Sequence, residues 1–313
     1  MRTFFSRFSL AAALLLLHAF LSACAGELTR EAFVVELENL PPQHENVKLV
    51  FFADLHLREE TKTLPIFEEL LEKVNAEDAH FILVGGDVVD QTTKEYPFSF
   101  REEMVSYLKK FRSRHGMIFC HGNHELAVGK ELLAEVLERE GIVVLDDSFF
   151  LPKIGGKVLG FYGHESRSTP RKKRGRKKEE YLKALEEFHA PTEKLLEKDK
   201  LLPKNAPLII LSHRPELFDR IDEKENILML SGHYHGGIVD LPFLKKGQLI
   251  RWYQKRKNGD LPPPKYIHGK FEEGRKKLFV TSGVSGGAHS ALRINVPREY
   301  LVLTLVRKKE KKQ

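Results

Sequence analysis

The chain has 313 residues, of which 42% are hydrophobic and 30% charged, and its 51 lysines and arginines outnumber 44 aspartates and glutamates. This composition is that of a soluble globular protein, long enough for one large domain or two ordinary ones. With 2 cysteines the chain cannot depend on a network of disulfides, so its stability must come from a packed core.

The N-terminal segment is a short apolar run with a basic flank. Two arginines precede residues 10–21, which are apolar apart from His18 and too short for a comfortable bilayer span of roughly 20 residues. Such a run is typical of a secretory signal, and its end, "LSAC", resembles a bacterial lipobox. We therefore expect residues 1–23 to be a lipoprotein-type signal peptide and Cys24 to carry the lipid. An uncleaved signal anchor is the alternative, and either one would tether the chain to a membrane.

From residue 47 onward, short apolar runs alternate with amphipathic segments, as expected of an α/β domain. Strands are predicted over residues 48–53, 80–85, 116–120, 142–145, 157–162, 207–212, 226–231, 277–281 and 300–306. Helices are predicted over residues 64–75, 101–113, 130–139 and 177–198. The simplest division is a tether at 24–46, one domain at 47–307 and a basic tail at 308–313.

A basic run, "RSTPRKKRGRKK" at residues 167–178, opens the last predicted helix. Its charge would suit lipid phosphates or nucleic acid, whereas a solvated surface loop explains the same composition. On a membrane-tethered chain with a net charge of +7, a basic surface favours anionic headgroups or phosphorylated substrates.

Polar side chains follow five of the apolar runs, where an α/β sheet presents functional residues. They are Asp54 and His56; Asp87 and Asp90; Asn123, His124 and Glu125; His213; and His233 and His235. In an extended continuation of a strand, residues i and i+2 point to the same side, so each Asp-x-His or His-x-His pair can reach one cleft.

A buried carboxylate such as Asp87 costs several kcal/mol unless it is paired or coordinates a cation. Carboxylate, imidazole and amide ligands together suit borderline divalent metals such as Mn²⁺, Fe²⁺ or Zn²⁺. The sequence has no thiolate cluster, which argues against a structural zinc site.

The order D-x-H, G-D-x-x-D, G-N-H-E, H and G-H-x-H is similar to that of the calcineurin-like metallophosphoesterases. The resemblance implies a four-layer αββα sandwich and two divalent metal ions, manganese in the first place and iron or zinc as alternatives. It implies a first metal held by Asp54, His56 and His235, a second held by Asn123, His213 and His233, and Asp87 as the bridge between them.

The resemblance also implies roles beside the metals. His124 would stabilise phosphoryl oxygens or protonate the leaving group, and Asp90 would orient a ligand histidine or the turn. Glu125 falls outside the implied ligand set.

"SGHYHGGIVDLP" and the late "ALRINVPRE" look like the membrane-associated bacterial phosphodiesterases of this superfamily, a group that includes relatives of UDP-2,3-diacylglucosamine pyrophosphatases. We expect a phosphohydrolase in the cell envelope, anchored by its N-terminus with the domain outside the cytoplasm, that cleaves a phosphodiester or pyrophosphate of a lipid-linked or nucleotide substrate. A UDP-2,3-diacylglucosamine pyrophosphatase of lipid A synthesis at the cytoplasmic face, or a non-catalytic metal-binding scaffold, are the alternatives. No nucleic-acid partner is expected, and the oligomeric state stays open.

Overall fold

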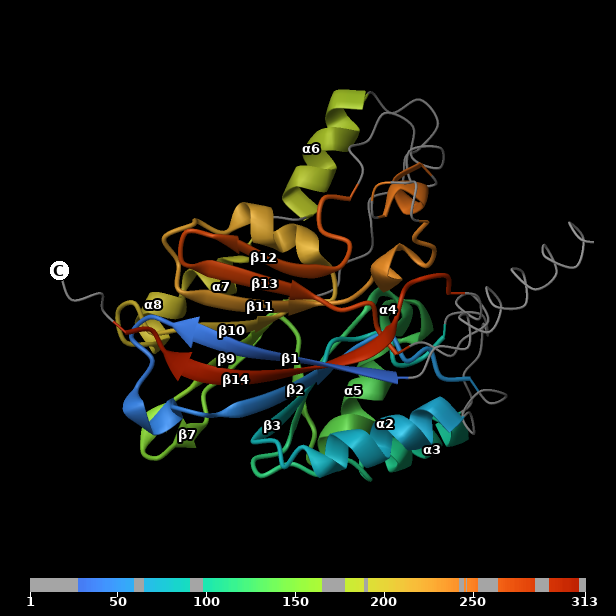
Figure 1. The fold of residues 1–313 in the computed structure, drawn as a ribbon, viewed down its shortest axis with the longest axis horizontal. Helices are drawn as coiled ribbons and strands as arrows, with labels where there is room; N and C mark the ends of the chain where they lie inside the picture. The colour runs from blue at the N-terminus through green and yellow to red at the C-terminus, as the bar shows by residue number, and fades with distance from the viewer. Residues whose placement is uncertain are drawn as a thin grey trace, which may run out of the picture.

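The computed structural model describes residues 28–58, 65–90, 98–164, 178–188, 191–241, 245, 247–252, 264–284 and 293–309. Two six-stranded sheets lie face to face, and helices cover their outer sides (Figure 1). This is the four-layer α/β sandwich predicted above.

The first sheet has the order β1-β14-β2-β3-β4-β5. The strands are β1 (Leu28–Leu37), β14 (Arg298–Arg307), β2 (Lys48–Phe52), β3 (Phe81–Val84), β4 (Met117–Cys120) and β5 (Val143–Leu145). From β2 to β5 the strands run parallel, so their carboxyl ends meet at one edge of the sheet.

The second sheet has the order β12-β13-β11-β10-β9-β6. The strands are β12 (Gly269–Glu273), β13 (Lys276–Val280), β11 (Ile227–Ser231), β10 (Leu208–Leu211), β9 (Gly160–Gly163) and β6 (Ser148–Phe150). The inner four are parallel, and both edge strands are antiparallel to their neighbours. A separate hairpin joins β7 (Lys153–Ile154) to β8 (Lys157–Val158).

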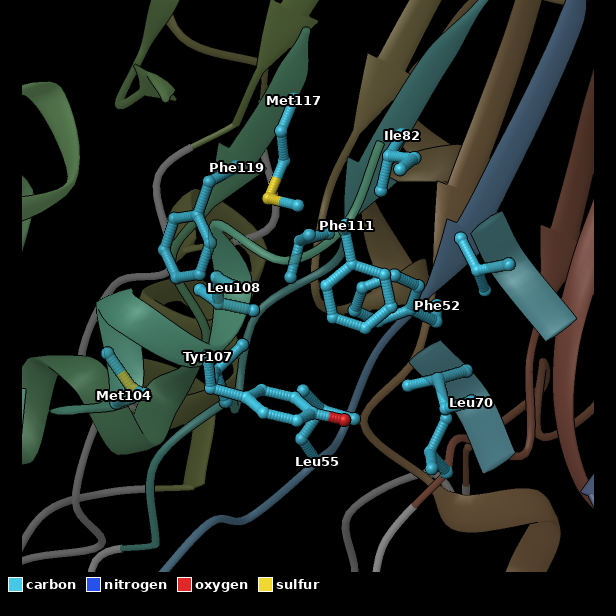
Figure 2. Close-up of a cluster of buried hydrophobic side chains, with 14 of the residues drawn as sticks. Phe52, Leu55, Leu70, Ile82, Met104, Tyr107, Leu108, Phe111, Met117 and Phe119 are labelled. Carbon is cyan, nitrogen blue, oxygen red and sulfur yellow. The ribbon is translucent and has the colours of Figure 1, made fainter. Parts of the chain in front are cut away.

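The central strands are buried on both faces, which explains their continuous apolar sequences. One face of each sheet packs against the other sheet, where side chains such as Leu49, Phe81, Ile209 and Phe279 form a common core. The outer face of the first sheet packs against α2 (Pro65–Ala76), α3 (Phe98–Leu108) and α5 (Lys130–Arg139). Figure 2 shows this second core, in which Phe52 and Phe119 from the sheet meet Leu70 and Leu108 from the helices.

The other helical segments, of which α6 is the longest with 11 residues, lie outside the second core. They are η1 (Pro42–His44), α4 (Asn123–Val128), α6 (Lys178–Phe188), α7 (Glu193–Leu196), α8 (Lys198–Leu201), η2 (Pro215–Arg220) and η3 (His235–Gly237). The single helix predicted over residues 177–198 is therefore wrong, because Pro191 follows α6 and Thr192 caps the start of α7 with its hydroxyl. The strand predicted over residues 157–162 is divided between β8 and β9.

The expected tether at residues 24–46 needs correction. Residues 28–37 form β1, which pairs with β14 along its whole length at the edge of the first sheet. Val35 is 2% exposed and packs into the core between the sheets, whereas Val34, on the opposite face, is 66% exposed. Residues 28–37 are therefore part of the folded domain and not of a tether.

Several predicted segments lie outside the described residues, namely the signal region with Cys24, most of the basic run at 167–178 and the end of the basic tail. Among the residues that are described, no helix combines the length and apolar character that a bilayer span requires.

The packing of β1 predicts a difference between two neighbouring valines. Val35→Ala should lower the free energy of unfolding by about 2 kcal/mol, because it removes two buried methyl groups and leaves a cavity. The control, Val34→Ala, should change it by less than about 0.5 kcal/mol. Urea denaturation measures both, and equal effects would contradict the packing of β1 in the core.

Candidate metal centre

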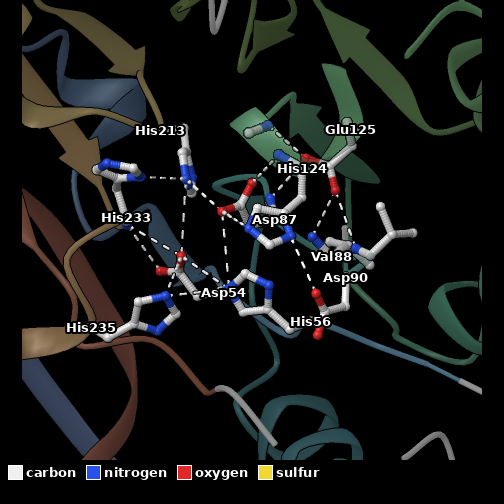
Figure 3. Close-up of polar contacts among 12 residues, drawn as sticks. Asp54, His56, Asp87, Val88, Asp90, His124, Glu125, His213, His233 and His235 are labelled. Carbon is white, nitrogen blue, oxygen red and sulfur yellow. Dashed lines mark hydrogen bonds and ion pairs between the residues drawn. The ribbon is translucent and has the colours of Figure 1, made fainter. Parts of the chain in front are cut away.

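Loops after β2, β3, β4, β10 and β11 bring the polar residues of the five motifs together (Figure 3). Three sets of side chains each offer ligand atoms within 4.8 Å of one another. They are Asp54, His56 and His235; Asp87, His213 and His233; and His56, Asp87 and His124.

The first set joins the end of β2 to the loop after β11. The Nε2 atoms of His56 and His235 are 3.3 Å apart. They lie 3.8 and 3.7 Å, respectively, from Oδ1 of Asp54. Three ligand-type atoms thus lie within 3.8 Å of one another, as ligands of one cation would.

The second set lies on the other side of Asp87. Nε2 of His213 is 3.0 Å from Oδ2 of Asp87 and 3.3 Å from Nδ1 of His233. The other ring nitrogen of His213, Nδ1, lies 2.7 Å from the carbonyl oxygen of Gly85 and can donate to it. That contact fixes the tautomer that leaves the Nε2 lone pair directed at the cluster.

Asp87 is the element common to the two sides. Its Oδ2 atom lies 3.0 Å from Nε2 of His213 and 3.9 Å from Nε2 of His56. A carboxylate in this position can share its oxygens between two cations, which is the bridging geometry that the resemblance implies.

Asn123 begins α4 beside this cluster. Its Oδ1 atom is buried and has no hydrogen-bond partner within the described part of the chain. Because buried polar atoms are nearly always satisfied, an acceptor in this state calls for a ligand. An amide oxygen next to imidazoles and a carboxylate fits a metal ion.

The electrostatics of the cluster also favour cations. Burial raises the pKa of Asp54, even though the nearby His213 acts in the opposite direction. Burial lowers the pKa of His56 to about 4 and the pKa values of His233 and His235 well below their usual range, so these imidazoles are neutral at pH 7. Metal ions bind neutral imidazoles, and a bound cation would offset the burial that raises the pKa of Asp54.

The pKa values of His213 and Asp87 also indicate that this part of the cluster favours a cation. Burial alone would lower the pKa of His213, but the charge of Asp87 raises it to about 9. Burial alone would raise the pKa of Asp87, and His213 instead holds it well below its usual range. The pocket thus stabilises positive charge next to Asp87, which divalent cations would supply.

The backbone of these loops is left-handed at several of the ligand-type residues. Five of these residues have φ between 47° and 77°, namely Asp54, His56, Asp87, His233 and His235. For residues other than glycine this left-handed conformation costs on the order of 1–3 kcal/mol each. The paired residues therefore meet through left-handed turns and not, as the sequence suggested, through an extended continuation of each strand.

Glycines leave room for two carboxylates. A Cβ atom on Gly122 would lie 2.1 Å from Oδ1 of Asp87, and one on Gly232 would lie 2.4 Å from Oδ2 of Asp54. Neither loop could approach its carboxylate so closely with any other residue at these positions.

Glu125 has a structural task that the sequence did not reveal. Its buried carboxylate accepts hydrogen bonds from the backbone N–H groups of Gly122, Asp87, Val88 and Val89, at 2.6, 2.8, 2.8 and 3.2 Å (Figure 3). It therefore joins the loop after β4 to the loop after β3. The sequence showed only that an acidic residue stands at this position of the motif. The partners of Glu125 are backbone atoms, which leave no pattern in the sequence.

His124 and Asp90 form a separate contact at the edge of the cluster. Nδ1 of His124 lies 3.6 Å from Oδ1 of Asp90, and Nε of Arg58 donates to Oδ2 of the same carboxylate at 2.6 Å. Burial alone would lower the pKa of His124, but Asp90 and Asp87 raise it. Asp90 therefore faces His124 and also interacts electrostatically with His56.

Comparison with known proteins agrees with this geometry. Residues 47–249 match the model of the family described as calcineurin-like phosphoesterase. An uncharacterized metallophosphoesterase of Campylobacter jejuni is 26% identical over 90% of this chain, which spans 64% of that protein's length. Phosphodiesterase YaeI of Escherichia coli is 25% identical over 90% of this chain and 88% of its own.

Solved structures resemble the chain more distantly. A dimetal phosphatase from Danio rerio has a TM-score of 0.44 and 11% identity, covering 76% of this chain and 88% of its own. The family match extends over most of the domain and includes the loops after β2, β3, β4, β10 and β11. Together with the His and Asp clusters it indicates a site for two divalent metals. The chain belongs to the calcineurin-like phosphoesterase family.

Proposed function

We propose that this protein is a membrane-tethered hydrolase that cleaves a phosphodiester or pyrophosphate with two divalent metal ions, manganese before iron or zinc. The observation that carries the proposal is the position of Asp87 between two sets of ligand-type atoms. The similarity to a protein named as a phosphodiesterase, over 88% of that protein's length, supports a diester as the substrate bond.

In this proposal Asp54, His56 and His235 would hold one metal, Asn123, His213 and His233 would hold the other, and Asp87 would bind both. Two such metals would supply an activated water molecule and polarise the phosphoryl oxygens. Hydrolysis joins the water oxygen to phosphorus, breaks the bond from phosphorus to the leaving oxygen and requires a proton on that oxygen.

His124 is the group in place to serve that oxygen. Its side chain is 16% exposed, and its Nε2 atom points toward the cluster, 3.9 Å from Oδ2 of Asp87. Oδ1 of Asp90 lies 3.6 Å from the other ring nitrogen, Nδ1. A protonated His124 can therefore bind a phosphoryl oxygen or donate a proton to the leaving group.

The proposal also includes a lipid anchor at Cys24. Lipidated Cys24 would hold the domain on the outer side of the membrane, where a phosphorylated lipid or small molecule could reach it. The support is the lipobox-like sequence after a short apolar run. A UDP-2,3-diacylglucosamine pyrophosphatase would need the opposite, cytoplasmic face. The side of the membrane on which the domain lies therefore distinguishes the two candidate functions. The full set of ligand-type residues disfavours a non-catalytic scaffold.

The bridging role of Asp87 predicts that Asp87→Asn abolishes hydrolysis of bis(4-nitrophenyl) phosphate and weakens the binding of both Mn²⁺ ions, because a neutral amide cannot bridge two dications. Asp78→Asn is a matched control, since Asp78 also has a positive φ but is exposed and pairs with Arg114. Turnover and metal content measure the effect. An Asp87→Asn variant that keeps full activity and two metals would refute the assignment.

The role of His124 predicts a different outcome. His124→Ala should retain its metal ions while kcat falls by a factor on the order of 10²–10⁴, the usual contribution of a positioned acid. The control His115→Ala changes an exposed histidine that precedes β4, at the other end of the strand. Loss of metal from the His124→Ala protein would show that His124 is a ligand and not the acid.

The anchor predicts that Cys24→Ser stops lipid attachment and signal processing, so that a heavier, unmodified precursor accumulates. Mass spectrometry of the purified membrane-fraction protein checks this. An intact parent chain with an unmodified Cys24 would instead support a signal anchor.

A further inference from the structure

The first described strand begins at the end of the domain that bears the metal centre. β1 runs parallel to β14, with Leu28 opposite Arg298, and β14 runs antiparallel to β2, with Leu301 opposite Phe51. Leu28 therefore lies level with the carboxyl end of β2, which Asp54 follows. Figure 1 shows β1 beginning on the side where α4 lies, with α8 on the opposite side. The chain before residue 28 thus joins the domain at the same end as the ligand-type residues.

The distance from this end of the domain to the proposed lipid anchor is short. Cys24 stands four residues before Leu28, and four residues span at most about 14 Å. From Leu28, β1 runs for 10 residues, about 33 Å, toward the opposite end of the sheet. A lipid on Cys24 would therefore hold the metal-centre end close to the bilayer and leave the opposite end farthest from it.

Trp252 is an exposed aromatic side chain beside the metal centre. It is 53% exposed and belongs to the short helical segment that follows Gly247. A Cβ atom on Gly237 would lie 3.2 Å from Cα of Gly247 and 3.4 Å from Cγ2 of Ile250, so this segment packs against Gly237. Gly237 follows His235 by two residues. The segment that carries Trp252 thus rests on the loop that carries a ligand-type histidine.

A second exposed apolar side chain lies at the same end, at the start of α5. Nζ of Lys130, the first residue of α5, is 2.6 Å from Oδ2 of Asp146, which directly follows the carboxyl end of β5. Leu132, two residues further along α5, is 49% exposed. The metal-centre end of the domain therefore presents apolar side chains from both of its sheets' connections to solvent.

The charge around Trp252 also suits a membrane surface. Between residues 245 and 252 the sequence has three basic residues and no acidic one, and Lys245 is exposed. Tryptophan is enriched where a bilayer meets water, and lysine and arginine are attracted to anionic headgroups. An exposed tryptophan in a basic segment, at the end from which the anchor leaves, matches the chemistry of an anionic bilayer.

We propose that the metal-centre end of the domain lies on the surface of the membrane that holds the anchor, with Trp252 in the interface. This inference rests on the proposed function, because it uses the lipid on Cys24. It makes a phosphorylated lipid of the same membrane the substrate that the site meets first. A second copy of the chain is the competing partner for this surface.

The fluorescence of Trp252 tests the contact, because Trp252 is the only tryptophan of the chain. The full chain is reconstituted in vesicles of phosphatidylcholine and phosphatidylglycerol, with or without bromine atoms on the acyl chains near the headgroups. Bromine quenches tryptophan only at close range. We expect most of the Trp252 emission to be lost in the brominated vesicles, and we expect acrylamide in the water to quench the remainder poorly.

A matched variant moves the tryptophan to the opposite end of the domain. Leu201, in α8, is 47% exposed, nearly as exposed as Trp252, and α8 lies on the side away from α4 in Figure 1. The double variant Trp252→Phe, Leu201→Trp should therefore emit equally in both kinds of vesicle and be quenched by acrylamide.

Three fluorescence results would overturn the inference. Equal emission of the parent chain in both kinds of vesicle would place Trp252 away from the bilayer. Protection of Trp252 from acrylamide without quenching by bromine would assign the surface to a second copy of the chain. Quenching of the tryptophan at position 201 as strongly as that of Trp252 would show that the domain has no fixed orientation.

Two further readouts separate this inference from the proposed function. Flotation with the vesicles reports the anchor, and turnover of bis(4-nitrophenyl) phosphate reports the hydrolase. A chain that floats and hydrolyses the diester while Trp252 stays unquenched refutes the membrane contact alone. A chain that does not float refutes the anchor and the contact together, whereas an inactive chain with a quenched Trp252 refutes the hydrolase alone.

Discussion

The metal centre depends on one buried carboxylate that touches no proposed metal position, that of Glu125. By accepting four backbone N–H groups it fixes the loop after β3 to the loop after β4. Asp87 can then hold its left-handed conformation, and its side chain can accept the backbone N–H of His124 at 2.8 Å. Asp87, which follows β3, is thereby held next to Asn123 and His124, which follow β4. The backbone strain at the ligand-type residues is offset by such hydrogen bonds and by the core between the sheets.

The part of the fold that could be predicted is the part buried on both faces. The central strands of both sheets have uninterrupted apolar sequences, so they can be recognised without knowing which strands they pair with. The short edge strands β6 and β12 mix polar and apolar residues, and β1 is recognisable mainly through the alternation of Phe33, Val35 and Leu37. The partner of β1 is β14, near the other end of the described chain, so local sequence could not reveal the pairing.

The candidate site, like the fold, has features that the sequence could predict and features that it could not. Residue types and their order indicated which side chains would meet, because parallel strands bring their ends to one edge. The left-handed turns, the backbone contacts of Glu125 and the contact of His213 with the carbonyl oxygen of Gly85 arise only in three dimensions. They also determine which lone pairs face the cluster and how the loops that carry the ligand-type residues are held together.

The central claim is that the two ligand sets hold two cations joined by Asp87. A crystal structure of the protein grown with Mn²⁺, with anomalous diffraction data, tests it most directly. The account predicts two anomalous peaks, one among Asp54, His56 and His235 and one among Asn123, His213 and His233, with oxygens of Asp87 bound to both. A single peak, or two peaks that Asp87 does not connect, would contradict it.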